Sequence, residues 1–256
     1  MANILFKKSY LYKTFKNVPY DNLWNSKGVF TTVRIKGKPF KLLFLKEHIR
    51  NLNQSLKAMN IKFVLISSLF NKKFNNLFNN NVRYDHLLRI AINNKKISFS
   101  LRKQKKISSS FKGILVNYKR PNPLVKNLYY KKILGFLKSI RTTDYEIILT
   151  HNKKLLEGCT TNVVLVKNKK LYIPKNDYYF GITLKFISKY SKRKIFKRDI
   201  FIKELNLFDE ILLVGSGKGI VQIKSIPQKK WKNKSSIIFN ELHDLYNSYI
   251  KNYIAI

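Results

Sequence analysis

The sequence predicts an α+β protein with two lobes. Short apolar segments with strand-like alternation are mixed with segments whose apolar residues recur every three or four positions, as on one face of a helix. Near the middle, Tyr118 to Pro123 contains two prolines, which interrupt regular structure. We therefore expect an N-terminal α/β lobe over residues 1–117, a connection over 118–125, and a larger C-terminal lobe over 126–256.

The first lobe begins with a clear strand and a clear helix. Residues 29–35 alternate as a strand does, and Gly37-Lys38-Pro39 predicts a turn after them. Residues 44–59 carry apolar side chains at helical spacing, which predicts an amphipathic helix. Two further strands and a basic, serine-rich loop are predicted to follow at 87–92, 97–101 and 102–110.

The second lobe is predicted to combine several strands with three longer helices. The helices are expected at 128–140, 183–190 and 239–253, with a short helical piece at 203–207. The strands are expected at 145–150, 162–167, 171–174 and 211–214. The last of these strands leads directly into a glycine turn, and no internal repeat is evident in the sequence.

The net charge of +39, from 52 basic and 13 acidic residues, allows two interpretations. Nucleic-acid binding is one, because neutralisation of phosphates by Lys and Arg drives such affinity. Compositional drift is the other, because the lysines are spread from end to end and no RNA-binding signature is present. We interpret the charge as drift and expect only non-specific nucleic-acid binding, although the field would attract anionic substrates.

Several classes of protein are excluded by composition. Cys159 is the only cysteine, so a disulfide framework or a thiolate metal cluster within one chain is impossible. The four histidines lack ligand spacing, and we expect no metal site. The apolar runs are too short to span a bilayer, and no secretory signal is recognisable. We expect a cytoplasmic protein, with organellar targeting left open.

Four short motifs follow one another in the second half and suggest a cofactor site. They are Lys126, Glu157 to Asn162, Gly181-Ile182-Thr183, and Gly215-Ser216-Gly217. A pyridoxal 5'-phosphate site needs a lysine for the aldehyde, an acid for the pyridine nitrogen, and backbone N–H groups for the phosphate. The four motifs supply a lysine, an acid and two glycine turns, in that order along the chain.

Each motif alone has an ordinary structural explanation. A glutamate is usually a solvated surface group, and a short glycine turn is usually a helix cap or a bend. Lys126 cannot be distinguished by composition, although it follows the proline-rich connection and precedes a predicted helix. The order and spacing of the turns behind Glu157 is therefore the stronger signal.

These residues resemble the class IV, fold-type IV pyridoxal-phosphate aminotransferases and lyases over most of the chain. Gly28 to Arg34 looks like the early strand of that family, and His48 to Leu52 looks like its His-x-x-Arg-Leu helix. The segment from Glu157 to Asn162 is the most specific match. The resemblance implies a homodimer with a β-barrel-like second lobe and a small, anionic, amino-acid-like substrate.

The resemblance also implies roles for individual residues. Lys126 would bind the cofactor aldehyde and move the α-proton, and Glu157 would contact the pyridine nitrogen. The phosphate would be held by residues of the two glycine turns, namely Ile182, Thr183, Gly215 and Ser216. Tyr130 could supply a phenol near the cofactor oxygen if one residue is deleted after Leu128.

The chain departs from the family pattern at two positions. The family arginine that grips the phosphate corresponds to Asn51, while Arg50 is one residue away and about 100° around the helix. Either the helix is shifted and Arg50 binds the cofactor, or the phosphate has lost a charged ligand. Leu184 replaces a second usual arginine.

The early strand bears on the reaction. Phe30-Thr31-Thr32 resembles the aminodeoxychorismate lyases, in which Thr31 and Arg34 would face an anionic substrate. This resemblance makes the conversion of 4-amino-4-deoxychorismate to 4-aminobenzoate and pyruvate, a step of folate biosynthesis, our first hypothesis. The second is an aminotransferase that acts on branched-chain or D-amino acids with 2-oxoglutarate. The third is a basic nucleic-acid-binding protein or an inactive relative.

Overall fold

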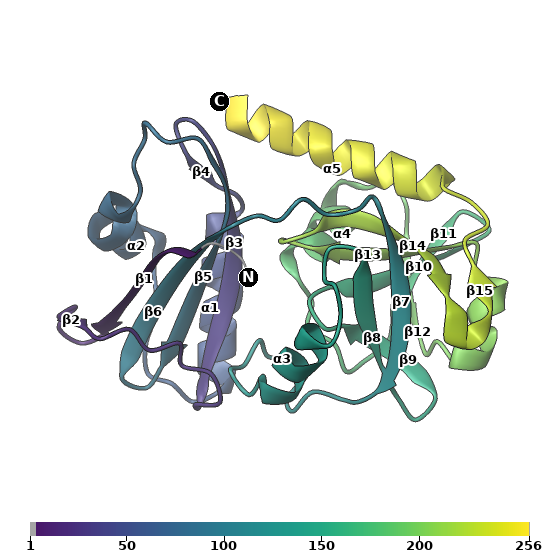
Figure 1. The fold of residues 1–256 in the computed structure, drawn as a ribbon, viewed down its shortest axis with the longest axis horizontal. Coiled ribbons are helices and arrows are strands. Elements are labelled where there is room, and N and C mark those ends of the chain that lie inside the picture. The colour runs from purple at the N-terminus through teal and green to yellow at the C-terminus, as the bar shows by residue number, and fades with distance from the viewer. Residues whose placement is uncertain (1–3, 256) are drawn as a thin grey trace. The chain divides into compact units, whose positions relative to one another are not determined.

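The computed structural model describes residues 4–255, which divide into two compact units (Figure 1). Of these residues, the first unit contains 4–105, 125–131 and 253–255, and the second contains 106–124 and 132–252. Each unit combines a sheet with helices, so the predicted α+β class is confirmed. None of the helices in the described part of the chain is long and apolar enough to cross a membrane.

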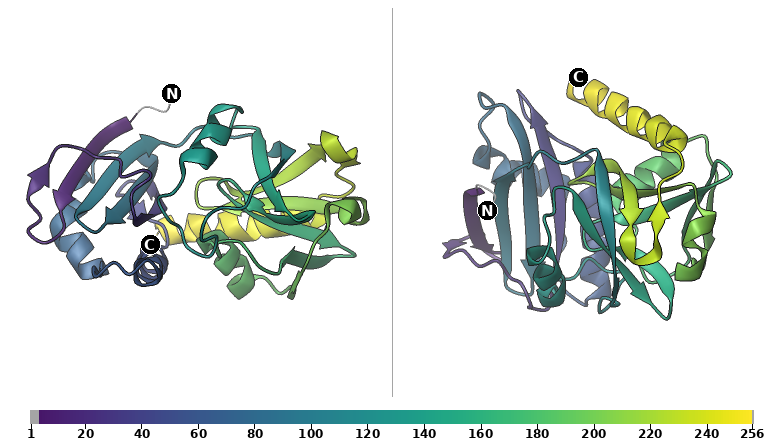
Figure 2. Two further views of the ribbon diagram at one scale, coloured as in Figure 1. Left: turned by 90° about the horizontal axis from the view of Figure 1, so that it is seen from below. Right: turned by 45° about the vertical axis from the view of Figure 1, so that its right-hand side comes forward.

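The first unit is built on a six-stranded antiparallel sheet with the order β2-β1-β6-β5-β3-β4. Its elements are β1 (Ile4–Leu11), β2 (Asn17–Val18), β3 (Gly28–Gly37), β4 (Lys41–Leu42), α1 (Leu45–Ala58), α2 (Ser67–Phe74), β5 (Tyr84–Asn93) and β6 (Lys96–Lys103). Helices α1 and α2 lie on one face of the sheet (Figure 2), where Leu52 and Phe70 join Val33 and Leu88 in the core. Alternation along β3 therefore leaves Phe30, Thr32 and Arg34 on the other face.

The segment that carries Lys126 is attached to this first unit. The N–H of Phe30 donates to the Lys126 carbonyl at 2.9 Å, and the N–H of Leu128 donates to the Gly28 carbonyl at 2.9 Å. Residues 126–128 therefore run as an extended, antiparallel neighbour of β3. Because these hydrogen bonds fix the backbone there, the helix predicted at 128–140 begins later, as α3 (Lys131–Lys138).

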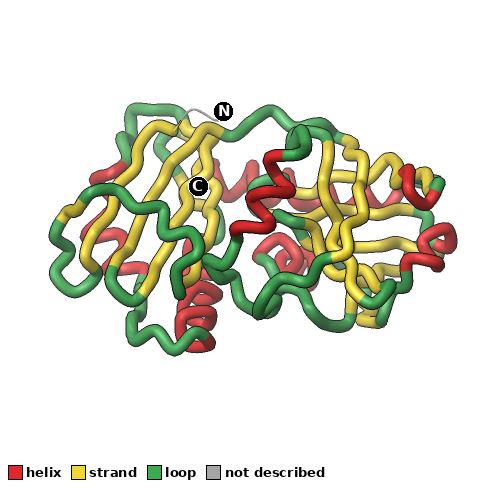
Figure 3. The backbone as a smooth tube through the Cα atoms, turned by 60° about the horizontal axis from the view of Figure 1, so that its bottom comes forward, coloured by secondary structure: helices red, strands yellow, loops and turns green. Residues whose placement is uncertain are grey.

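The second unit is built on a nine-stranded sheet with the order β12-β11-β10-β13-β14-β7-β8-β9, and β15 pairs with β14. Figure 3 shows how its strands curl, as the predicted barrel-like lobe requires. Its strands are β7 (Ser110–Asn117), β8 (Tyr145–His151), β9 (Lys154–Gly158), β10 (Asn162–Lys167), β11 (Lys170–Pro174), β12 (Ile195–Arg198), β13 (Glu210–Gly215), β14 (Gly219–Ile226) and β15 (Trp231–Lys232). The α-helices α3, α4 (Ile182–Tyr190) and α5 (Ile237–Ala255) complete it, although the first residue of α3 and the last residues of α5 belong to the first unit. The core includes Phe111, Phe208 and Trp231.

The division into units differs from the boundaries drawn on the sequence. Residues 110–117 join the second unit because β7 pairs in parallel with both β8 and β14. Residues 125–131 join the first unit through their hydrogen bonds to β3. The proline-rich stretch is irregular, as predicted, but the chain crosses between units on either side of Lys126.

Candidate active site

In the first unit, Lys126 lies beside a cluster of three aromatic rings. Its Nζ is 5.0 Å from the centroid of the Phe30 ring. Phe30 packs edge-on against Tyr130 at 5.1 Å and against Trp24 at 5.0 Å, and Trp24 stacks on Tyr130 at 5.5 Å. The half-buried amine therefore has an apolar wall on one side, which limits access of water to it.

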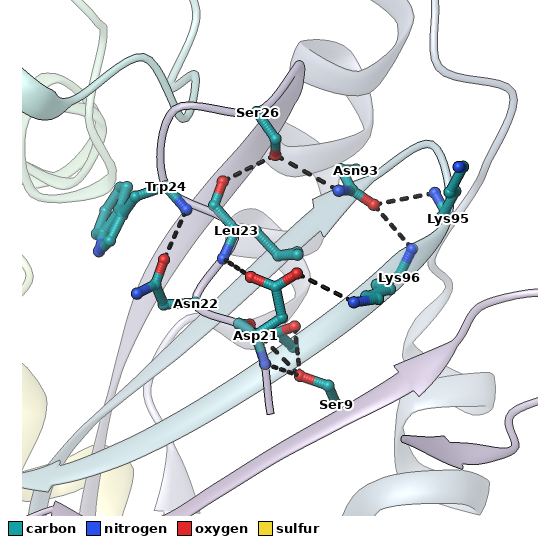
Figure 4. A network of polar contacts seen from close by, with 10 residues as sticks. Ser9, Asp21, Asn22, Leu23, Trp24, Ser26, Asn93, Lys95 and Lys96 are labelled. Carbon is teal, nitrogen blue, oxygen red and sulfur yellow. Dashed lines mark hydrogen bonds and ion pairs between the residues drawn. The ribbon is translucent and has the colours of Figure 1, made fainter. Parts of the chain in front are cut away.

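A polar network holds the loop that carries Trp24 (Figure 4). Asp21 accepts a hydrogen bond from the N–H of Leu23 at 2.9 Å and pairs with Lys96 at 3.1 Å. The N–H of Asn25 donates to the Leu128 carbonyl at 2.9 Å, so the loop is tied to the segment that follows Lys126. The loop that carries Trp24 is therefore held by the Asp21–Lys96 ion pair and by the backbone of Leu128.

Arg89, which the sequence analysis did not single out, adds a cation to this cluster. It lies on β5 opposite Thr32, and its Cζ is 3.7 Å from the centroid of the Trp24 ring. Its Nη2 donates to the Asn22 carbonyl at 2.7 Å, while its Nε is buried without a hydrogen-bond partner among the described residues. Burial lowers the pKa of Arg89 to about 10, so the guanidinium stays charged at neutral pH. Arg89 therefore places a positive charge beside the aromatic cluster.

The two residues predicted to contact substrate, Thr31 and Arg34, both have partners within the first unit. The Thr31 hydroxyl is buried and hydrogen bonds to His48 Nδ1 at 2.7 Å. Burial and then the charge of Lys126 lower the pKa of His48 to about 3, so this imidazole is neutral. Arg34 pairs with Asp85 at 2.9 Å.

The buried side of α1 carries Asn51 and not Arg50. His48, Asn51 and Leu52 are buried, whereas Arg50 is exposed. A shifted helix would have placed Arg50 on the buried side. Arg50 therefore gains no support as a cofactor ligand, and Asn51 occupies the position that the resemblance gives to an arginine.

In the second unit, Glu157 is a buried carboxylate with fixed partners. Its Oε1 accepts a hydrogen bond from Arg120 Nε at 2.6 Å, and its Oε2 accepts one from the N–H of Tyr179 at 3.1 Å. The Arg120 and Glu157 side chains are 3% and 6% exposed. Arg120 also donates to the Pro123 carbonyl at 2.7 Å. A buried charge is stable only with such pairing, so the site is built to keep a carboxylate at this point.

The two ends of the Glu157–Asn162 motif hold the same loop. Glu157 binds the N–H of Tyr179, while Asn162 accepts a hydrogen bond from the N–H of Gly181 at 3.1 Å and donates to the Tyr179 carbonyl at 2.6 Å. A Cβ on Gly181 would lie 2.7 Å from Asn162 Oδ1. The motif and the following glycine turn are therefore parts of one structure, although they are far apart in sequence.

The loop leads into α4, whose first turn is a candidate anion site. Among the described residues, no side chain caps the helix at Gly181. The N–H groups of a first helical turn have no partner within the helix, and the helix dipole favours an anion there. Ile182 and Thr183, the predicted phosphate residues, are buried at this end.

The second glycine turn packs against the Glu157–Asn162 motif. A Cβ on Gly215 would lie 3.0 Å from the Thr160 carbonyl and 3.3 Å from Thr161 Cγ2. Gly215 and Ser216 therefore lie in the same region of the second unit as Glu157. The structure thus brings together every predicted cofactor residue of this unit, while Lys126 belongs to the other unit.

Comparison with known proteins identifies the family. A family model described as Amino-transferase class IV matches residues 28–226, which is most of the chain. The protein belongs to the class IV aminotransferase family. A sequence search among curated proteins gives no match.

Solved structures have the same fold. A branched-chain aminotransferase from Thermoproteus uzoniensis, solved with norvaline, has a TM-score of 0.78 and 17% identity, and the match covers 95% of this chain and 94% of that one. The corresponding enzyme from Thermobaculum terrenum, in its PLP form, has a TM-score of 0.77 and 18% identity, covering 98% and 95%. A hypothetical aminotransferase from Mycobacterium tuberculosis, in a PLP-bound form, has a TM-score of 0.72 and 14% identity, covering 95% and 100%. These matches confirm the predicted fold-type IV architecture.

Proposed function

We propose that the protein is a pyridoxal 5'-phosphate-dependent aminotransferase that acts on amino acids. The observation that carries the proposal is the buried Glu157, which binds the loop before α4, together with the contact of Thr160 and Thr161 with the Gly215 turn. Family membership supports the same conclusion, and two of the similar structures are described as PLP-bound or PLP forms.

The residues of the second unit fit such a cofactor. Glu157 provides the carboxylate for the pyridine nitrogen, and Arg120 holds that carboxylate from its other oxygen. The N–H groups at Ile182 and Thr183 provide an anion site, and the turn at Ser216 provides another. When bound, the cofactor supplies an electron sink for the substrate α-carbon.

Lys126 carries the reactive amine in this proposal. It binds the cofactor aldehyde and moves the proton at the substrate α-carbon. The amine lies 5.0 Å from the centroid of the Phe30 ring, and the neighbouring His48 imidazole is neutral. This setting suits an amine that must act as a nucleophile and then as a base.

Arg89 indicates the class of substrate. Its guanidinium keeps its charge and lies 3.7 Å from the centroid of the Trp24 ring, in the aromatic cluster beside Lys126. This positive charge would attract a substrate carboxylate. An amino-group acceptor with two carboxylates, such as 2-oxoglutarate, fits this donor, and branched-chain or D-amino acids are the donors that we propose.

Aminodeoxychorismate lyase activity is the second candidate. The sequence Phe30-Thr31-Thr32 and the cationic Arg89 favour it, because its substrate is also a dicarboxylate. However, the Thr31 hydroxyl, which would distinguish this branch, is already hydrogen bonded to His48. We therefore rank the lyase below the aminotransferase.

The test begins with the cofactor linkage. The purified protein is incubated with pyridoxal 5'-phosphate, reduced with borohydride and mapped by peptide mass spectrometry. The pyridoxyl group should be on Lys126 and should disappear in Lys126→Ala, whereas Lys131→Ala should keep it. A label that remains on other lysines in Lys126→Ala would refute the assignment.

The reaction is then assigned with substrates. Formation of glutamate from 2-oxoglutarate and a branched-chain or D-amino acid would establish the aminotransferase, while pyruvate release from 4-amino-4-deoxychorismate would establish the lyase. We also propose a homodimer, as the family resemblance implies, and sedimentation analysis would test it.

A further inference from the structure

A second buried ion pair lies beneath the glycine turn of the second unit. Glu146, on β8, is completely buried, and Lys218 lies in the turn between β13 and β14 with its side chain only 10% exposed. The Lys218 ammonium pairs with Glu146 Oε2 and lies 4.7 Å from the centroid of the Phe111 ring. A lysine in a hairpin turn can extend freely into solvent, so this inward course needs a cause.

The same carboxylate also holds the Glu157–Asn162 motif. Glu146 Oε2 accepts hydrogen bonds from the Thr160 hydroxyl at 2.9 Å and from the Thr161 hydroxyl at 3.4 Å. A Cβ on Gly158 would lie 3.2 Å from Glu146 Cγ, so the motif turns directly over this side chain. Glu146 therefore ties two segments to one point.

The other end of the pair controls the geometry of the turn. The N–H of Lys218 donates to the Gly215 carbonyl at 3.0 Å, which closes the turn around Ser216 and Gly217. Glycines on both sides of Ser216 give this segment a wide choice of backbone conformations. The ion pair of Lys218 with Glu146 restricts the conformations that the turn can adopt.

Burial of the two charges of this pair costs desolvation free energy. Two apolar side chains of similar volume would often stabilise a protein as well as a buried ion pair does. Glu146 Oε1 has no hydrogen-bond partner among the described residues, so the carboxylate is not fully satisfied. The pair is thus better explained by what it positions than by what it contributes to folding.

We propose that Glu146 and Lys218 are positioning residues that hold the Gly215–Gly219 turn in the conformation that binds the cofactor phosphate. The proposal rests on the proposed function. Because the Lys218 charge is neutralised by Glu146, Lys218 acts as a support under the turn and not as a phosphate ligand. Preorganisation of this kind increases affinity by removing the need to order the turn on binding.

The experiment compares affinities for pyridoxal 5'-phosphate and for pyridoxal, which lacks the phosphate. The variants are Glu146→Gln, Lys218→Met and the double substitution. The double variant has no unpaired buried charge, so it can be tested even if Lys218→Met does not fold. The matched control is Arg198→Met with Glu204→Gln, an ion pair of the same unit that lies between β12 and the Ile202–Leu207 helix. Thermal unfolding is recorded for each variant.

We expect the double variant to lose about tenfold in the ratio of the two affinities, because only the phosphate-specific part depends on the turn. The control should keep the wild-type ratio. A purely structural role would change thermal stability, or both affinities together, and would leave the ratio unchanged; that result would overturn the inference while the proposed function stands. A wild-type protein that binds neither compound would overturn both.

Discussion

Substitution of Arg120 by methionine tests whether the acid of the site is held as a buried carboxylate. Methionine keeps most of the volume of the arginine stem but removes the guanidinium that contacts Glu157 Oε1 at 2.6 Å. Among the residues that the structure describes, the buried carboxylate would then keep one donor, the N–H of Tyr179. Loss of one partner from a buried ion pair is strongly destabilising, because the other charge stays uncompensated.

The structure allows the magnitude to be estimated. Both side chains are less than one-tenth exposed, so the range for breaking a buried pair applies, about 3–5 kcal/mol. The surviving hydrogen bond from Tyr179 places the expected loss near the lower end, about 3 kcal/mol in the free energy of unfolding. The double variant Arg120→Met, Glu157→Gln carries no buried charge and should recover at least about half of this loss.

Urea unfolding followed by circular dichroism measures these differences. Arg193→Met is the control, because the Arg193–Glu241 pair in the same unit is more exposed, at 28% and 41%, and should contribute about 1 kcal/mol or less. If Arg120→Met were no more harmful than this control, Glu157 could not be a buried carboxylate that depends on Arg120, and the reasoning would fail.

Four other outcomes are expected. Glu157→Gln should keep the cofactor but slow turnover by orders of magnitude, since an amide cannot hold the ring nitrogen protonated; near-normal turnover would exclude the role. The wild-type free energy of unfolding should rise with pH between about 3 and 6.5, because the unfolded chain binds a proton on His48 that the folded chain excludes. His48→Gln should reduce the slope of this free energy against pH by up to about 1.4 kcal/mol per pH unit, as measured by urea unfolding at several pH values. Burial raises the pKa of the Cys159 thiol, so Ellman's reagent should react with it only after unfolding, and rapid native labelling would contradict its placement. Binding to random RNA should disappear steeply with added salt, and a complex that survives physiological salt would instead favour the nucleic-acid hypothesis.

The elements that the sequence predicted well are those with strong local periodicity. Helices α1 and α5 and strands β3, β5 and β6 follow directly from the spacing of apolar residues. The segments that it missed or misassigned depend on distant partners. β7 and β14 pair with each other in parallel although they are about a hundred residues apart, and no local pattern reports such pairing. Residues 128–130 have helical spacing, but hydrogen bonds from Leu128 to β3 decide their conformation.

The residues of the candidate site also divide into those that a local motif reveals and those that depend on distant partners. Glu157, Gly181 and Gly215 could be found because each lies in a short local motif. Arg120 and Lys218 could not be found in this way, because each acts through a carboxylate that is distant in sequence. Nothing in a single sequence shows which lysine or arginine of so many will pair with which acid.

The scarcity of acidic residues and arginines in this chain nevertheless indicates which charged positions matter. In a chain with 13 acidic and 52 basic residues, a lysine says little about its position, whereas an acid or an arginine is scarce. Within residues 4–255, every acidic side chain except Glu47 accepts a hydrogen bond or forms an ion pair with another residue of that range. Carboxylates are paired by five arginines, namely Arg34, Arg120, Arg141, Arg193 and Arg198. The planar guanidinium has a geometry that lysine does not reproduce, so arginines would persist where that geometry is needed while other basic positions become lysine.

The buried carboxylates Glu146, Glu157 and Glu210 extend this argument, because each holds a turn or a helix start of the second unit. We therefore interpret the surface charge as drift toward lysine, and we expect the scarce residue types to mark the positions where the fold and the candidate site require a particular side chain.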